Sequence, residues 1–197
     1  MKKINKGIIF IFILSIIIIS YSSFKICKNY YNVKKNIDTF NNIIERNNED
    51  EKKEKTIDIK NDKPKEKEKN IIGKITILQK QIPIIEGTSS LDLENGAAHL
   101  KDSVLPGEYG NCAIFGHRDT VFKVLQNLNP GDKIYIETLE KKKFTYEVQN
   151  IYIIDPKKED VVKQYSGEVL TLVTCYPFSY FGDAPKRFVV ESNLIKK

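Results

Sequence analysis

The chain has 197 residues, with 32 Lys and Arg against 26 Asp and Glu, and so a formal net charge of +6. Five of the six excess positive charges lie in residues 1–28, which hold no acid, and residues 71–197 carry both signs equally. A nucleic-acid-binding domain needs clustered cations on its folded surface, so this distribution excludes that class. The three cysteines lack metal-ligand spacing and predict neither a disulfide framework nor a zinc site.

An uncharged apolar stretch, residues 7–24, follows three lysines near the N-terminus. It is 18 residues long and consists mostly of Ile and Phe, and about 20 apolar residues span a bilayer core. The apolar part of a signal peptide is usually shorter, roughly 7 to 15 residues. An uncleaved transmembrane anchor is therefore favoured, with cleavage near Ser20 and Ser22 as the alternative. Lysines flank both ends, so the positive-inside rule does not orient the anchor.

Residues 25–70 are rich in Asn, Lys, Glu and Asp and end in a run of alternating charges over residues 60–69. Such a segment cannot bury enough apolar surface to offset the entropy of ordering it. The composition predicts a solvated stalk or linker that holds the following domain away from the bilayer. A helical pattern is present around Tyr30–Arg46.

Residues 71–197 show short β-type runs separated by turn residues, such as Asn129–Asp132, and form the expected single folded domain. Alternation of apolar and polar residues in these runs predicts an antiparallel barrel or sandwich. Helical pattern is limited to residues 120–128 and 91–100. The domain is therefore predicted to be mainly β with one or two short helices.

Cys175 is the best candidate for a reactive group. It ends an apolar β run and precedes Pro177, so its thiol is expected at a strand end. Arg187 begins the next predicted strand, and a strand, a loop and a returning strand bring both residues to one end of a sheet. A nucleophilic cysteine reacts as the thiolate, which a neighbouring cation stabilises.

His117 lies at the end of another β run, beside Arg118. Each of these residues also has a structural interpretation, because a free cysteine is usually a small buried hydrophobic residue. Cys112 fits that description, since it lies inside a strand-like run. The placement of His117, Cys175 and Arg187 at strand ends favours a joint catalytic role.

Together these residues resemble a sortase, a membrane-anchored cysteine transpeptidase of Gram-positive cell surfaces. The sequence TLVTC at 171–175 fits the family's TLxTC pattern, PGEYGN at 106–111 leads to Gly116-His-Arg118, and Arg187 opens the last strand. The similarity covers about residues 71–197. The short connection over 155–167 and the lack of long insertions are most similar to class D.

The resemblance implies an eight-stranded sortase-type β-barrel that follows the transmembrane helix and the polar stalk. It implies a hydrolase of the thiol-protease type that cleaves an LPxTG sorting signal between Thr and Gly. Cys175 would form a thioester with the signal, and an amine of the cell wall would then resolve it. His117 would act as general acid and base, and Arg187 would bind the substrate and stabilise the oxyanion.

The resemblance also implies lesser roles near the site. Thr174 is a candidate for orienting the scissile backbone, and His99 is a candidate substrate-site residue beside its structural alternative. Arg118 is expected to position a loop by pairing with an acid. No acidic cluster is dense enough to predict calcium binding, and neither a metal nor a cofactor is expected.

The implied partners are surface proteins that carry sorting signals and an amine of a cell-wall precursor, and nucleic acid is excluded. These substrates place the catalytic domain outside the cell, on a single-pass anchor in the cell membrane, with residues 1–6 in the cytoplasm. Two alternatives remain open at this point. One is a cell-wall enzyme like the L,D-transpeptidases, and the other is a non-catalytic, membrane-tethered β module that only binds its ligand.

Overall fold

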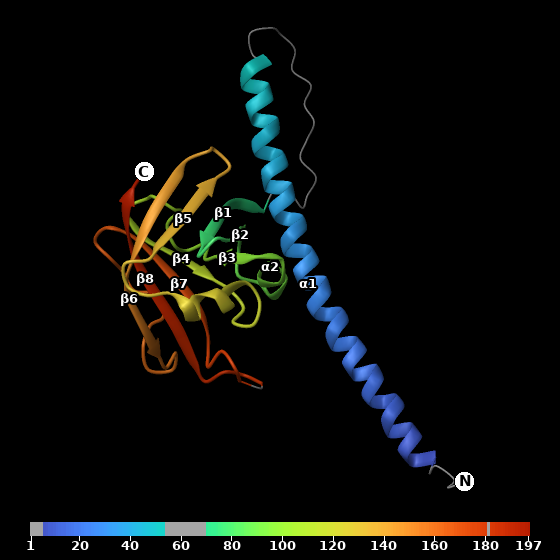
Figure 1. The fold of residues 1–197 in the computed structure, drawn as a ribbon. Coiled ribbons are helices and arrows are strands. Elements are labelled where there is room, and N and C mark those ends of the chain that lie inside the picture. The colour runs from blue at the N-terminus through green and yellow to red at the C-terminus, as the bar shows by residue number, and fades with distance from the viewer. Residues whose placement is uncertain (1–5, 54–69, 181) are drawn as a thin grey trace.

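The computed structural model describes residues 6–53, 70–180 and 182–197. A long helix, α1 (Lys6–Lys53), precedes a closed barrel of eight strands. Figure 1 shows α1 passing along one side of the barrel and extending well beyond it toward the N-terminus. The barrel consists, in chain order, of β1 (Ile71–Ile77), β2 (Lys80–Glu86), α2 (Ser90–Asn95), β3 (Ala97–His99), β4 (Gly110–Phe115), the 3₁₀ helix η1 (Val121–Asn127), β5 (Lys133–Thr138), β6 (Lys143–Ile154), β7 (Glu168–Tyr176) and β8 (Lys186–Lys196).

The strands close the barrel in the order β1-β2-β3-β4-β7-β8-β6-β5, which confirms the predicted eight-stranded fold. Two neighbouring pairs, β2 with β3 and β4 with β7, are parallel, and the remaining pairs are antiparallel. The prediction of a purely antiparallel sheet, which rested on local alternation, is therefore wrong. Alternation reports which face of a strand is buried but not the direction of the strand beside it.

The barrel interior is filled by the inward-facing side chains of alternate strand positions. In β1, every second residue from Ile71 to Ile77 is buried, as the period-2 pattern predicts for a strand with one buried face. Cys112 of β4 belongs to this core and is almost fully buried, which confirms its interpretation as a core residue. The 3₁₀ helix covers the core with Val121, Phe122 and Leu125.

Helix α2 is shorter than the helix expected over residues 91–100. It begins with a capping box, in which the Ser89 hydroxyl accepts from the Asp92 N–H and the Asp92 carboxylate accepts from the Ser89 N–H. Beyond Gly96 the chain becomes β3, because Ala97–His99 pairs with β2 on one side and β4 on the other. This pairing provides the backbone hydrogen bonds that a longer helix would otherwise supply.

The polar segment differs from the solvated stalk that its composition predicts. Residues 25–53 continue α1 without a break, and residues 54–69 lie outside the described part of the chain. On the helix, Phe40 is 0% exposed and packs with Ile71 and Ile85 of the barrel. Few apolar residues suffice, because a helix gathers residues three or four positions apart onto one face.

Two asparagines strengthen this contact between helix and barrel. Asn29 Nδ2 and Asn36 Nδ2 donate to the carbonyl oxygens of Glu94 and Asn95, at 2.9 Å each. These carbonyls lie at the end of α2, where backbone acceptors have no partner within the helix. The second half of α1 is therefore a docked element of the domain and not a spacer.

Candidate active site

Cys175 lies near the end of β7 and is half-buried. In the antiparallel pair of β7 and β8 it stands directly opposite Arg187. Side chains of directly opposed residues lie on the same face of a sheet, about 5 Å apart at their Cβ atoms. The pairing therefore places the thiol and the base of the guanidinium side chain next to each other, as the sequence predicts.

His117 comes to the other side of Cys175 through the parallel pair of β4 and β7. In that pair Phe115 is level with Val173, and the Gly116 N–H donates to the Val173 carbonyl at 3.1 Å, one residue beyond the strand. The same register brings His117 level with Cys175. Since β7 lies between β4 and β8, His117, Cys175 and Arg187 form one row across three adjacent strands.

The backbone around His117 is held by hydrogen bonds on both sides. The His117 carbonyl accepts from the N–H groups of Thr120 and Phe122, which begin the 3₁₀ helix. The imidazole itself is exposed, so it is open to a substrate at the end of the barrel. Rigid backbone under an accessible side chain suits a group that must transfer protons.

Thr174 lies beside the catalytic row but is buried, with 2% of its surface exposed. Its hydroxyl donates to the Gly116 carbonyl at 2.7 Å. This bond ties β7 to the residue that precedes His117. This position favours a role in fixing the backbone that carries His117. It does not favour direct contact between Thr174 and a substrate backbone.

Arg118 differs from its expected pairing with an acid. Its Nη2 donates to the carbonyl oxygens of Tyr180 and Gly182, at 2.8 and 2.9 Å, and its guanidinium lies 5.9 Å from the centre of the Tyr180 ring. It therefore links the turn after β4 to the connection between β7 and β8. On the same connection, Arg187 Nη1 donates to the carbonyls of Ala184 and Lys186.

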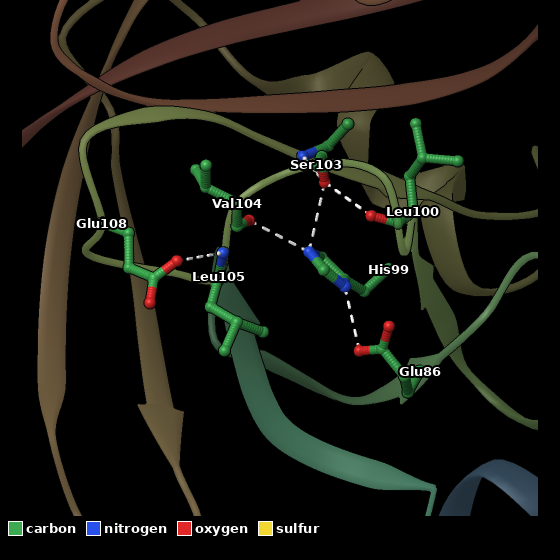
Figure 2. A network of polar contacts seen from close by, with 8 residues as sticks. Glu86, His99, Leu100, Ser103, Val104, Leu105 and Glu108 are labelled. Carbon is green, nitrogen blue, oxygen red and sulfur yellow. Dashed lines mark hydrogen bonds and ion pairs between the residues drawn. The ribbon is translucent and has the colours of Figure 1, made fainter.

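His99 is the last residue of β3, opposite Ile114 of β4, three residues before His117, and is 1% exposed. Figure 2 shows its ring between Glu86 and the turn after β3. Nδ1 lies 3.0 Å from Glu86 Oε2, and Nε2 lies 3.0 Å from the carbonyl of Val104. Because a carbonyl only accepts, Nε2 carries a hydrogen.

Ser103 extends this network to β4. Its hydroxyl donates to the Leu100 carbonyl, lies 3.1 Å from His99 Nε2 and accepts from the N–H of Ala113. The network thus braces the segment that leads from β3 into β4. Such full burial favours a structural role for His99 over contact with substrate.

A buried carboxylate, Glu191 of β8, is a feature that the sequence analysis missed. Tyr152 of β6 and Tyr165 of the β6–β7 connection donate their hydroxyls to Glu191 Oε1, and Asn150 Nδ2 lies 3.3 Å from Oε2. Burial, followed by the bond to Glu191, raises the pKa of Tyr152. The available signal was an acid between Val190 and Ser192, two buried residues in the middle of β8.

A second bond holds the same connection. Asn111 Nδ2 of β4 donates to the Lys163 carbonyl at 2.8 Å, while Asn111 Oδ1 accepts from the Thr171 hydroxyl. Through Asn111 and Glu191, the β6–β7 connection is fastened over the outer face of β4, β7 and β8. It borders the surface on which Cys175 opens.

In the part of the chain that the structure describes, neither the second candidate thiol, Cys112, nor a group of metal-ligating side chains adds to the site. Burial raises the pKa of the Cys112 thiol, and nearby carboxylates add to the shift, so this thiol stays protonated in the core. Among the described residues, no group of three or more His, Cys, Asp or Glu lies close enough together to hold a metal ion.

A barrel with a cysteine, a histidine and an arginine in one row at its end defines a class of thiol-dependent acyl-transfer enzymes. The chain matches the Sortase domain family over residues 74–195. It therefore belongs to the sortase family, whose members are cysteine transpeptidases.

Individual relatives agree with the class D resemblance. Sortase D of Bacillus subtilis (strain 168) is 41% identical over 129 residues, which are 65% of this chain and 65% of the relative. Sortase A of Bacillus anthracis is 31% identical over 64% of this chain and 61% of the relative. These matches span less than two thirds of the length of either relative.

Among solved structures, a Clostridium perfringens sortase D5 transpeptidase is 30% identical and superposes with a TM-score of 0.61. The superposition covers 86% of this chain and 99% of that protein. Sortase C1 of Streptococcus agalactiae is 29% identical, with a TM-score of 0.59 over 66% of this chain and 69% of that one.

Proposed function

We propose that this chain is a sortase that cleaves an LPxTG-type sorting signal between Thr and Gly and transfers the acyl part to a cell-wall amine. The observations that support the proposal are the strand order β4-β7-β8, the position of Cys175 opposite Arg187, and the hydrogen bond from Gly116 to Val173 just before His117. Cys175, His117 and Arg187 supply a nucleophile, a proton-transfer group and a fixed positive charge, which are the parts that acyl transfer requires.

In the first step, the Cys175 thiolate attacks the carbonyl carbon of the signal's Thr. Arg187 binds the signal and stabilises the oxyanion of the tetrahedral intermediate. The C–N bond then breaks, and the leaving Gly amine takes a proton from His117. The product of this step is a thioester between Cys175 and the signal's Thr.

In the second step, the cell-wall amine attacks the thioester and gives a proton to His117. The C–S bond breaks, a new amide forms, and Cys175 leaves as the thiolate. His117 thus returns to its starting protonation state, so that no external acid or base is consumed. Water in place of the amine gives hydrolysis of the signal.

The apolar part of the signal is expected to lie on the outer face of the barrel below Cys175. Val173 and Val189 are opposite each other on that face, and the β6–β7 connection is fastened beside it by Asn111 and Glu191. Both valines are buried (1% and 0% exposed), so the proposed groove for Leu and Pro is formed by the connection that covers them.

The proposed location is the cell membrane, with the catalytic domain outside. Helix α1 is long enough and apolar enough to cross a membrane, and the proposed substrates, exported proteins and a cell-wall amine, are outside the cell. We propose the uncleaved anchor over residues 7–24, with residues 1–6 in the cytoplasm and the catalytic unit over residues 71–197.

Membership of the sortase family favours this function over an L,D-transpeptidase. An experiment distinguishes the transpeptidase from the non-catalytic binding module. The full chain in detergent is incubated with a fluorogenic LPxTG peptide and an amine, and the thioester is sought by intact mass. Cys175→Ala, His117→Ala and Arg187→Ala are each expected to lose turnover at least a hundredfold, because each removes one part of the reaction.

Cys112→Ala is the matched control for the thiol, because Cys112 lies in the core away from the catalytic row. It is expected to keep the catalytic constants of the unaltered chain. Turnover that survives Cys175→Ala, or a chain whose Cys175 resists alkylation and forms no thioester, would establish the binding module instead.

A further inference from the structure

Helix α1 runs along the barrel in the same direction as β2 and β3. Asn36 of α1 contacts the Asn95 carbonyl, just before β3 begins. Four residues later, Phe40 packs against Ile85, near the end of the parallel strand β2. From its N-terminus toward its C-terminus, this part of α1 therefore runs in the same direction as β2 and β3.

Both strands start at the catalytic end of the barrel. Ala98 of β3 stands opposite Phe115 of the antiparallel β4, so the residues before β3 approach the level of His117. At the start of β2, Lys80 Nζ donates to the Thr120 carbonyl, three residues beyond His117. The apolar half of α1 therefore leaves the barrel at the end that holds Cys175.

Figure 1 shows the same arrangement. The β7–β8 connection and the N-terminal half of α1 point to one end of the molecule, and the C-terminus lies at the opposite end. The turn before β4, which contains Tyr109, belongs to that opposite end, because β4 starts there and runs toward His117.

The apolar stretch of α1 ends close to the barrel. The last residue of the uncharged stretch is Phe24, and Asn29 already contacts α2. Five residues of helix rise only about 8 Å. A groove between α1 and α2 at this level combines aromatic, basic and acidic side chains, and is lined by Tyr21, Phe24, Lys28, Asn29, Asn32 and Glu94.

The catalytic end presents groups that suit a bilayer surface. Tyr180 of the β7–β8 connection is 47% exposed and lies beside the Arg118 guanidinium. Tyrosine rings and apolar side chains accumulate in the headgroup layer, and basic groups attract anionic lipid headgroups.

We propose that the catalytic end of the barrel lies against the phospholipid bilayer, with the β7–β8 connection in the headgroup layer. The proposal rests on the membrane anchor of the proposed function. Because the docked part of α1 continues the anchor helix, it fixes the orientation of the barrel relative to the bilayer. Cys175 then opens toward substrates at the membrane surface and not toward those in bulk solution.

The test uses the full chain in nanodiscs that contain anionic lipids and brominated lipid chains. The sequence has no Trp, so Tyr180→Trp introduces a single fluorophore at the catalytic end. Tyr109→Trp is the matched control at the opposite end, where the native ring is 71% exposed. Bromine quenches only at short range.

The Tyr180→Trp reporter is expected to lose emission in brominated nanodiscs and to emit at shorter wavelength, because an aromatic ring at the membrane surface lies at the headgroup level. Tyr109→Trp is expected to keep its emission. Equal quenching at both ends, or no quenching at either, would overturn the proposal.

Turnover of an LPxTG peptide is measured in the same nanodiscs, because the two proposals can fail separately. Quenching of Tyr180→Trp without turnover by the unaltered chain would contradict the transpeptidase function and support the orientation. Turnover with unquenched reporters would support the function and contradict the orientation.

Discussion

Thr174 and Cys175 are neighbours on β7 with opposite surroundings. The thiol opens at the surface row, while the Thr174 hydroxyl is buried and bonded to the Gly116 carbonyl. Successive side chains of a strand point to opposite faces, so one dipeptide supplies both the proposed nucleophile and a hydrogen bond to the residue before His117. We therefore propose Thr174 as a positioning residue, which acts through the turn that carries the imidazole.

Thr174→Val keeps the shape of the side chain and removes the hydroxyl donor. The Gly116 carbonyl is then buried without this partner, at a cost of about 1–3 kcal/mol. We expect kcat to fall about tenfold with KM nearly unchanged, since 1.4 kcal/mol corresponds to a factor of ten in rate. Steady-state kinetics with an LPxTG peptide measures both constants.

Thr171→Val is the matched control. Thr171 is equally buried and also donates one hydrogen bond of 2.7 Å, but to Asn111 and not to the turn before His117. It is expected to lose similar stability with little change in kcat. A Thr174→Val enzyme with the kcat of this control would contradict the positioning role.

The β6–β7 connection is the element that a sequence describes least well, because it has no regular hydrogen-bond pattern of its own. Its place depends on Glu191, which is 8% exposed and accepts from Tyr152 and Tyr165. A buried carboxylate is tolerated only with such partners, so this one is a specific anchor for the connection.

Glu191→Gln preserves the size of the side chain and removes the charge and one acceptor oxygen. Hydrogen bonds to a charged group contribute about 1.5–3 kcal/mol each, so the connection should loosen. We expect KM for the signal peptide to rise several-fold with a smaller change in kcat, and residues 155–167 to exchange amide hydrogens faster.

Glu168→Gln serves as the control for this variant. Glu168 pairs with Lys197 on the surface, and such pairs contribute less than about 1 kcal/mol. Its kinetics and hydrogen exchange should match those of the unaltered chain. An unchanged KM for Glu191→Gln would show that the connection keeps its place without the carboxylate.

The docking of α1 depends on one fully buried ring. Phe40→Ala removes the side chain that packs with Ile71 and Ile85, and Phe→Ala in a core costs about 3–5 kcal/mol. We expect residues 29–44 to lose protection in hydrogen exchange while the barrel keeps its own. The exposed Tyr31 on the same helix provides the control, and Tyr31→Ala should leave protection unchanged. Equal protection in the two variants would contradict a docked helix.

Closure of the barrel brings together residues that are far apart in the chain. His117 comes from the end of β4, Cys175 from β7 and Arg187 from β8, and the parallel pairing of β4 and β7 is what joins the first to the second. The same closure buries Cys112 and Tyr146. Burial raises the pKa of both groups; nearby carboxylates raise the pKa of Cys112 further, and Cys112 raises the pKa of Tyr146 further.

These raised pKa values predict a loss of stability at high pH. The folded protein keeps both protons, while the unfolded chain releases them near pH 8.5 for Cys and 10 for Tyr. The stabilisation is therefore complete below pH 8.5 and declines above it, by about 3.5 kcal/mol at pH 10.5. Urea unfolding of the full chain in detergent at several pH values measures this.

Cys112→Ala removes the group with the lower pKa in the unfolded chain. The free energy of unfolding of this variant should be lower at pH 7 but decline less between pH 8 and 10.5. An unaltered chain with constant stability over this range would contradict the raised pKa of the core thiol.

Local sequence signals were sufficient for every strand except β3, for a helix apolar enough to cross a membrane, for the core position of Cys112 and for the candidate row of His117, Cys175 and Arg187. Alternation of side chains, the length of an uncharged stretch and reactive residues at strand ends depend only on residues close in the chain. The roles of the row remain proposals until the substitutions are tested.

The parallel pairs, the buried Glu191 and the docked α1 were decided by the tertiary structure alone. Each depends on partners far away in the chain: β7 beside β4, Tyr165 beside Glu191, and Ile85 beside Phe40. The composition of residues 25–70 predicts a solvated stalk because it averages over the segment, whereas docking needs only one helix face with a surface to receive it. That surface exists only once the barrel has closed.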